Sequence, residues 1–237
     1  MSEATVFRPE FKNKAIRSYV LRSGRMTEGQ RRALEQHWEI YRLSLFDGPV
    51  GCWTKVFGND APVVLEIGFG MGDSLLQMVQ DSPDTNFVGI EVYPPGAGRL
   101  VSNAAKLGLS NLRVYLADAM DVLADCIPEH SLARVQLYFP DPWHKKKHNK
   151  RRIVQPDFIG KIRSRLMANG EFHMATDWEP YAEHMAELMA KEAGFANLGG
   201  DQVFSPRPDF RPVTKFEKRG QRLGHGVWDL RYTRCSP

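Results

Sequence analysis

Three acidic side chains follow three successive apolar runs of this sequence, in an order that suits a nucleoside-like ligand. Glu66 lies in the run 63–67, Glu91 near the end of 86–92, and Asp118 at the end of 112–118. If each run is a parallel strand, its carboxyl end meets the edge at which open α/β sheets bind ligands. Glu91 stands 21 residues after Gly70, where a carboxylate can accept from both ribose hydroxyls, and Asp118 is placed to accept from an adenine amino group. Each acid alone is more often a helix cap or a solvated edge, whereas the three together favour a pocket.

A glycine-rich turn joins the first run to a helix pattern. Gly68, Gly70 and Gly72 follow the strand, and Asp73 opens the helix. Such a turn lets the backbone approach a ligand closely. A dinucleotide fingerprint needs a further glycine where Asp73 stands, and a carboxylate there would repel a pyrophosphate. The ligand is therefore cationic or neutral at this point, and S-adenosylmethionine, with its sulfonium and amino group, suits the turn and Glu66.

Asp141 stands between two prolines directly after a fourth apolar run, 134–139. Pro140 and Pro142 exclude a helix and fix the local backbone. A simple turn would also explain this sequence. Its position at the predicted sheet edge, just before a basic run, instead predicts that Asp141 is held rigidly beside the methyl group of the donor.

The basic run extends from Lys145 to Arg152 and reads KKKHNKRR, which places six of the chain's 32 Lys and Arg residues in eight positions. A solvated loop or helix face is the ordinary explanation of such a run. Here Trp143, His144 and His148 flank or interrupt it and offer stacking surfaces beside phosphate donors, which favours a nucleic acid. No third ligand accompanies the two histidines, so we expect no metal site.

A second basic stretch lies in residues 1–26, which we predict to be a flexible arm. A tail without a function is the open alternative. Thr27 and Gln30 have the spacing of a capping box, so a helix is expected to begin there. Residues 27–237 then form a single domain.

The elements that must position these residues alternate between strand and helix patterns, which predicts an α/β fold: a doubly wound, mostly parallel Rossmann-like sheet with helices on both faces. The chain has 237 residues, 42% of them hydrophobic and 25% charged, and a net charge of +4. This composition excludes disordered, collagenous and disulfide-based proteins. No export signal or membrane span is visible, and the three cysteines, Cys52, Cys126 and Cys235, are widely spaced. We therefore expect a cytoplasmic protein with no membrane contact.

Several of these stretches resemble the bacterial single-subunit tRNA (guanine-N7-)-methyltransferases. The most specific is 139–152, in which Phe-Pro-Asp-Pro-Trp precedes the basic run. The others are 64–72, 89–92, 175–181, 211–220 and, in the arm, 17–25. The similarity covers essentially the whole chain and departs from the family pattern at no motif position.

The resemblance implies a class I methyltransferase that uses S-adenosylmethionine to methylate the variable-loop guanine of tRNA. Donor-binding positions fall on Glu66, Gly68, Gly70, Gly72, Glu91, Asp118 and Asp141, and Asp141 is also the catalytic candidate. Substrate positions fall on Lys145, Asp177, Thr214, Lys215, Phe216 and Glu217. Contacts with tRNA fall on Lys147, His148, Asn149, Lys150, Arg151 and Arg152, and in the arm on Arg17, Arg22 and Arg25. Asp177 also precedes a helix pattern with Pro180, so a role as a helix cap stays open.

Guanine N7 has an exposed lone pair and carries no proton at neutral pH, so in-line displacement needs no general base. Asp141 is then expected to act as an ionised acceptor that stabilises the charge arriving on the purine. Two other functions stay open: methylation of a small-molecule or protein acceptor, and RNA binding beside a vestigial pocket. We expect a monomer without an obligatory protein partner, with a homodimer as the alternative.

Overall fold

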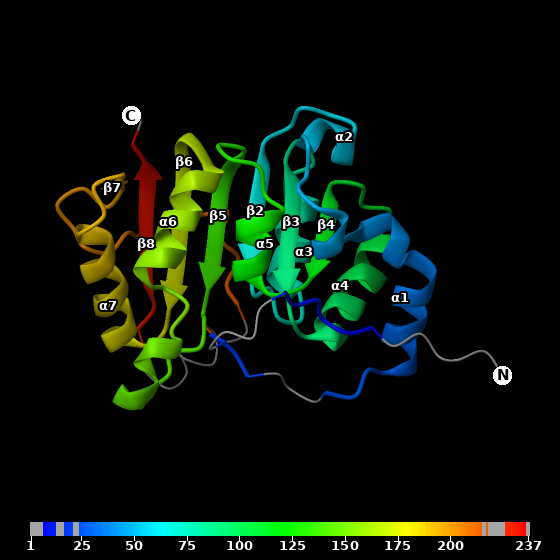
Figure 1. Ribbon diagram of the computed structural model, residues 1–237, viewed down its shortest axis with the longest axis horizontal. Coiled ribbons are helices and arrows are strands. Elements are labelled where there is room, and N and C mark those ends of the chain that lie inside the picture. The colour runs from blue at the N-terminus through cyan, green and yellow to red at the C-terminus, as the bar shows by residue number, and fades with distance from the viewer. Residues whose placement is uncertain (1–6, 13–16, 21–23, 215–216, 218–225, 236–237) are drawn as a thin grey trace.

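An eight-stranded sheet forms the centre of the computed structural model, in the order β1-β4-β3-β2-β5-β6-β8-β7 (Figure 1). The structure describes residues 7–12, 17–20, 24–214, 217 and 226–235. The strands are β1 (Arg42–Leu43), β2 (Val63–Ile67), β3 (Asn86–Glu91), β4 (Leu112–Leu116), β5 (Leu132–Tyr138), β6 (Leu166–Thr176), β7 (Phe195–Asn197) and β8 (Trp228–Arg234). The first six in spatial order are parallel, and β8 is antiparallel to both β6 and β7.

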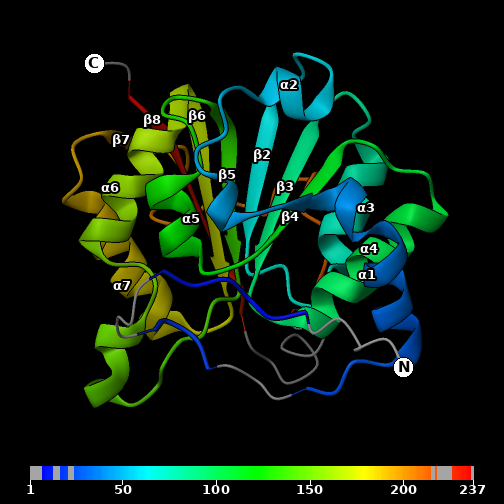
Figure 2. The same cartoon turned by 45° about the vertical axis from the view of Figure 1, so that its right-hand side comes forward.

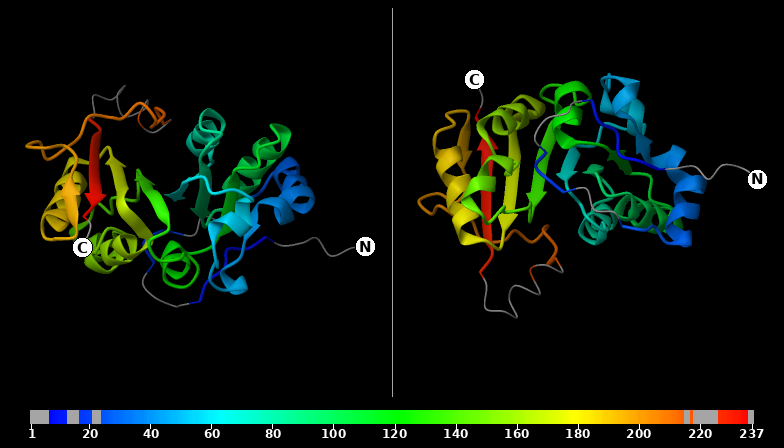
Figure 3. Two further views of the ribbon diagram at one scale, coloured as in Figure 1. Left: turned by 90° about the horizontal axis from the view of Figure 1, so that it is seen from above. Right: turned by 60° about the horizontal axis from the view of Figure 1, so that its bottom comes forward.

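Helices cover both faces of this sheet, as the sequence predicted (Figures 2 and 3). One face carries α1 (Glu28–Tyr41), α3 (Asp73–Asp81) and α4 (Pro94–Lys106) over β2, β3 and β4. The other carries α5 (Ala119–Asp125), α6 (Pro156–Arg165) and α7 (Glu179–Ala190), and the short α2 (Trp53–Phe57) lies at its margin. Two 3₁₀ turns, η1 (Leu45–Asp47) and η2 (Lys146–Arg151), complete the described elements.

Alternating residues of the central strands supply two separate hydrophobic cores. In β2, Val63, Leu65 and Ile67 pack under α5, α6 and α7, whereas Val64 packs under α3 and α4. Because both faces are covered, the strand is apolar at almost every position, which is typical of a buried parallel strand. The exception is Glu66, which shares the face of Val64 and lies at the carboxyl end of the strand.

The helix predicted to begin after Thr27 does begin there. The Thr27 side chain accepts from the Gln30 backbone N–H at 3.2 Å, and the Gln30 side chain accepts from the Thr27 N–H at 2.8 Å. This reciprocal capping box satisfies two backbone donors that the first turn would otherwise leave unpaired.

The described parts of the arm lie along the carboxyl edge of the parallel strands, where they appear blue in Figure 1. The Glu10 backbone N–H donates to the Leu116 carbonyl at 2.8 Å, and its carboxylate accepts from Ser44 Oγ at 2.9 Å. The Lys12 N–H donates to Asp121 Oδ2 at 2.9 Å. Residues 7–12 are thus hydrogen-bonded to the domain, while the predicted flexibility of the arm as a whole stays a prediction.

Candidate active site

A cavity of about 550 Å³ opens at the carboxyl edge of the sheet, between the glycine turn, the ends of β3, β5 and β6, and the arm. Its polar lining includes Glu91, Asp141 and Asp177, and its aromatic lining includes His144 and Trp178. Gly68 and Gly70 supply backbone to one wall, and Ser18, Tyr19 and Val20 supply another. The predicted edge therefore does hold a cavity, and a segment from the arm forms part of it.

The glycine turn has the backbone that a close approach to a ligand requires. Gly68 and Gly70 have φ angles of 76° and 59°, in the left-handed region that favours glycine, and a Cβ at either would project into open space. Gly72 differs, because it caps α3 and packs against Leu100 instead of lining the cavity. Gly96 of α4 lies so close to the Gly70 carbonyl that a Cβ there would clash with it. No pattern in the sequence predicted this contact between Gly96 and the turn.

Glu91 ties the end of β3 to the glycine turn. Its carboxylate accepts from the N–H groups of Gly70 at 2.7 Å, Val92 at 2.7 Å and Tyr93 at 3.1 Å. Three backbone donors fix the carboxylate in the wall of the cavity, and a carboxylate in this position can act as an acceptor toward a ligand.

Glu66 is only 3% exposed, and its Oε2 has no hydrogen-bond partner among the residues that the structure describes. Burial, aided by the negative charge of Glu91, raises the pKa of Glu66 to about 8. An orphaned carboxylate beside a glycine turn suits a positively charged ligand group, because a cation would both satisfy the oxygen and offset the desolvation. The residues present therefore fit S-adenosylmethionine, which carries a sulfonium and an amino group.

Asp118 has two partners within the protein. It caps α5 by accepting from the Met120 N–H at 2.8 Å, and it accepts from the Tyr19 hydroxyl at 2.8 Å. Its side chain lines a second cavity, of about 730 Å³, on the other side of the arm. The helix cap that the sequence left as an alternative is thus present, and Asp118 reaches the first cavity through Tyr19.

Asp141 is exposed into the first cavity from a strained turn. Phe139 and Trp143, two non-glycine residues, have φ angles of 51° and 47° on either side of it. Left-handed backbone at bulky residues is costly and persists only where the surroundings enforce it. Here the Phe139 N–H donates to the Ala175 carbonyl at 2.8 Å, and Arg152 Nε donates to the Pro142 carbonyl at 2.9 Å.

Most of the basic run forms η2, and its side chains are either exposed to solvent or packed against other parts of the protein. Lys145, Lys147 and Lys150 are exposed. Arg152 is instead buried at 6% exposure, with its guanidinium 4.8 Å from the centre of the Tyr181 ring. This places Arg152 under the Asp141 turn, in contrast to the exposed lysines of the same run.

Arg151 holds the arm against the basic run. Its guanidinium lies 3.9 Å from the centre of the Trp143 ring and donates to the carbonyls of Arg17 and Tyr19, both at 3.1 Å. Trp143 Nε1 donates to the Ser18 carbonyl at 2.9 Å. His148 packs edge-to-face on Trp143, with ring centres 5.8 Å apart. Hydrogen bonds to Arg151 and Trp143 therefore hold residues 17–20 between the two cavities.

Comparison with known proteins agrees with this geometry. A family model described as "Putative methyltransferase" matches residues 60–230. The tRNA (guanine-N(7)-)-methyltransferase of Saccharophagus degradans is 61% identical over 226 residues, which cover 95% of this chain and 98% of that protein. The protein of the same name from Alcanivorax borkumensis is 58% identical over 217 residues, covering 92% and 90%.

The chain belongs to the tRNA (guanine-N(7)-)-methyltransferase family.

Solved structures share the fold of this methyltransferase at low sequence identity. The 16S rRNA methyltransferase KamB superposes with a TM-score of 0.55 at 17% identity, covering 78% of this chain and 93% of that chain. An rRNA methylase from Streptococcus thermophilus gives a TM-score of 0.51 at 12% identity, covering 75% and 89%. Both confirm the Rossmann-like class I methyltransferase fold expected from the sequence.

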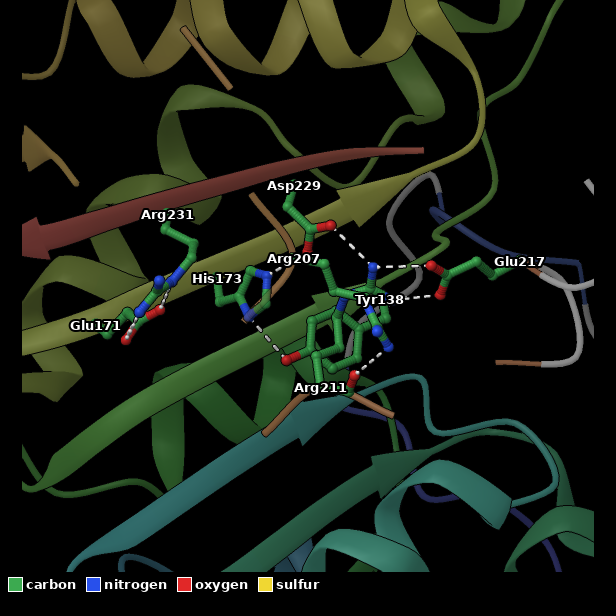
Figure 4. A network of polar contacts seen from close by, with 8 residues as sticks. All are labelled: Tyr138, Glu171, His173, Arg207, Arg211, Glu217, Asp229 and Arg231. Atoms are coloured by element: carbon green, nitrogen blue, oxygen red, sulfur yellow. Dashed lines mark hydrogen bonds and ion pairs between the residues drawn. The ribbon is translucent and has the colours of Figure 1, made fainter. Parts of the chain in front are cut away.

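Arg211, Glu217 and Asp229, near the C-terminal end of the methyltransferase, take part in a buried polar network. The network lies on the face of the sheet that α3 and α4 also cover (Figures 3 and 4). Arg211 is fully buried and donates to Glu217 Oε2 at 2.6 Å and to Asp229 Oδ1 at 2.8 Å. Asp229 also pairs with His173 Nε2 at 2.7 Å, and His173 Nδ1 lies 2.9 Å from the Tyr138 hydroxyl. Burial lowers the pKa of His173, so its neutral form donates from Nε2 to Asp229 and accepts from Tyr138.

Of the expected substrate residues, the network holds Glu217, and the Thr214 hydroxyl oxygen accepts from the Glu217 N–H at 3.1 Å. Neither lines the first cavity, whereas Asp177 does. Lys145 is exposed at the start of η2 and Arg25 is exposed before α1. The Asn149 carbonyl accepts from the Arg152 N–H at 3.0 Å. Lys215, Phe216 and Arg22 lie outside the residues that the structure describes.

Among the described residues, no group of three His, Cys, Asp or Glu side chains is placed to hold a metal ion. None of the helices in the described ranges combines the length and apolar character needed to cross a membrane.

Proposed function

We propose that this enzyme methylates N7 of the variable-loop guanine of tRNA, and that its residues act by positioning and by charge, without a general base. It is an S-adenosylmethionine-dependent tRNA (guanine-N7-)-methyltransferase. The observation that carries the mechanism is that one cavity is lined by both Glu91 and Asp141. Glu66, with its orphaned oxygen, directly precedes the lining residue Ile67, and the exposed Lys145 directly follows the lining residue His144.

The part of the cavity that would bind the methyl donor is formed by the glycine turn and by acidic side chains held in place. Glu66 would accept from the amino group of the donor, Gly68 and Gly70 would lie against it, and Glu91 would accept from the ribose hydroxyls. Asp118 supports this wall by holding the Tyr19 hydroxyl. S-adenosylmethionine, when bound, supplies an electrophilic methyl group for in-line displacement.

The acceptor side of the cavity is the part in which the target guanine would lie. Among the described residues that line the cavity there is no Lys or Arg whose charge would repel a positively charged purine. Asp141 and Asp177 line the cavity, and we assign them as acceptors for the N1–H and amino edge of guanine. An adenine would leave one of these acceptors facing the lone pair of its N1, which is unfavourable because both atoms are electron-rich. Asp141, fixed by two prolines and by Arg152, would stabilise positive charge as it develops on the purine.

The tRNA side is assigned to the exposed members of the basic run, Lys147 and Lys150, together with Lys145 and Arg25. These ammonium and guanidinium groups can reach phosphates, whereas the Arg151 and Arg152 side chains are already bonded to the protein. We also assign Glu217 and Thr214 to substrate binding. Arg211 holds Glu217 in place, and the Glu217 N–H donates to the Thr214 hydroxyl oxygen.

The test is incubation with a labelled methyl donor and unmodified tRNA, followed by mapping of the alkali-labile 7-methylguanine. We expect label at one variable-loop guanine and none in a tRNA with adenine there. Label on another base, or on no RNA at all, would overturn the proposal. Binding of tRNA without methyl transfer would instead indicate an RNA-binding protein with a vestigial pocket.

A further inference from the structure

We propose that Trp178, supported by His144, is the platform on which the target purine stacks, and that it binds 7-methylguanine more tightly than guanine. This inference rests on the proposed function, because it assigns a further residue to the same reaction. Trp178 follows β6 and His144 follows the Asp141 turn, so two separate strand ends bring them together. Both line the first cavity with Asp141 and Asp177.

The two rings form a compact aromatic unit. Their centres lie 4.4 Å apart with an interplanar angle of 84°, an edge-to-face contact. His144 is exposed and Trp178 is half-buried, with its apolar body packed against the core under α7. Trp178 thus packs against the core on one side and lines the cavity on another, so part of its ring surface can contact a base.

Hydrogen bonds at both ends of its peptide unit hold the backbone of Trp178 in place. Its N–H donates to Thr176 Oγ1 at 3.2 Å, and its carbonyl accepts from the N–H groups of Tyr181 at 2.9 Å and Ala182 at 3.0 Å. Trp178 is thus the N-cap residue of α7, and Asp177 precedes it at the end of β6. A base stacked on this ring would therefore lie at a defined position relative to both aspartates.

The chemistry of the reaction explains why tryptophan suits this position. Guanine becomes a cation when N7 is methylated, and positive charge develops on the ring during the transfer. Among the aromatic side chains, tryptophan attracts a cation through its ring quadrupole most strongly, and this attraction adds to ordinary stacking. Asp141 and Asp177 add negative charge on the same cavity wall. The platform would therefore favour the transition state and product over the neutral substrate.

The test compares W178F and W178L with the wild type, and W38L serves as a matched control because Trp38 is also half-buried but lies on α1 and does not line the cavity. Inhibition of tRNA methylation by guanosine monophosphate and by 7-methylguanosine monophosphate is measured in a mildly acidic buffer, in which the methylated base retains its N1 proton and is mainly cationic. Binding of S-adenosylhomocysteine and circular dichroism report whether each variant retains its fold.

We expect the wild type to bind the methylated nucleotide about tenfold more tightly, W178L to lose this preference, and W178F to retain part of it. The kcat/KM of W178L should fall about tenfold with the affinity for S-adenosylhomocysteine unchanged. If W178L does not fold, the reduced preference of W178F carries the test. An unchanged preference in the folded variants would refute the platform even if activity fell. A wild type that does not methylate tRNA guanine would refute the proposed function instead.

Discussion

Replacement of Glu66 by glutamine should make the ligand-free protein more stable at alkaline pH and at the same time weaken binding of the donor. Glu66 is buried beside Glu91, and its pKa is raised from 4.5 to about 8. A raised carboxyl pKa means that the folded state favours the protonated form. Its contribution to stability is therefore complete below about pH 4.5 and is lost as the pH rises toward 8.

The magnitude follows from the two pKa values. Between pH 5.5 and 8.5 the unfolded chain ionises Glu66 freely, whereas the folded protein resists ionisation until about pH 8. The linkage relation then gives a loss of about 3 kcal/mol in the free energy of unfolding over this interval. Glutamine has nearly the same shape and no charge, so E66Q should lack this part of the pH dependence.

The assay is urea unfolding of wild type and E66Q at the two pH values, with E35Q as control because Glu35 is exposed on α1. The stability of E66Q relative to wild type should rise by about 3 kcal/mol between them, and that of E35Q should not change. A constant difference would refute the assigned environment of Glu66.

A second measurement tests the same carboxyl group in binding. A cation placed against Glu66 lowers its pKa, so near pH 7 donor binding should release a proton from the wild type that E66Q does not release. Calorimetry in two buffers of different ionisation enthalpy measures this difference. Equal proton release by the two proteins would contradict the assignment of Glu66 to the amino group.

Three further predictions concern the acceptor side. Replacing both Lys147 and Lys150 by alanine should lower the log-log salt slope of tRNA binding by about 1.4–1.8, and K106A, on an exposed position of α4, should leave it unchanged. D141N should reduce the single-turnover methylation rate about 100- to 1000-fold with donor affinity retained, and a rate near that of wild type would exclude its electrostatic role. R152M should lose about 2 kcal/mol of unfolding free energy and lower kcat, because the Pro142 carbonyl loses its charged donor; an unchanged kcat would separate Arg152 from the Asp141 turn.

The strand pattern and the glycine turn could be predicted from the sequence because they depend on local properties. Continuous apolar runs fix buried parallel strands, and only glycine adopts the left-handed backbone of Gly68 and Gly70 at little cost. The spacing between Gly70 and Glu91 predicted that the two residues lie at the same edge, because adjacent parallel strands end there. They are joined by a 2.7 Å hydrogen bond. The capping box at Thr27 is local in the same sense.

Tertiary structure alone decided which charged side chains remain free to bind a ligand. Arg151 and Arg152 are indistinguishable from their neighbours in a basic run, yet one holds the arm and the other lies buried under the Asp141 turn. Asp118 meets Tyr19 from 99 residues away, and Arg211 joins two acids under the last strand. The sequence determines how many charges the chain carries, but desolvation and pairing depend on which distant segments meet, and these set the pKa, the partner and the accessibility of each charge.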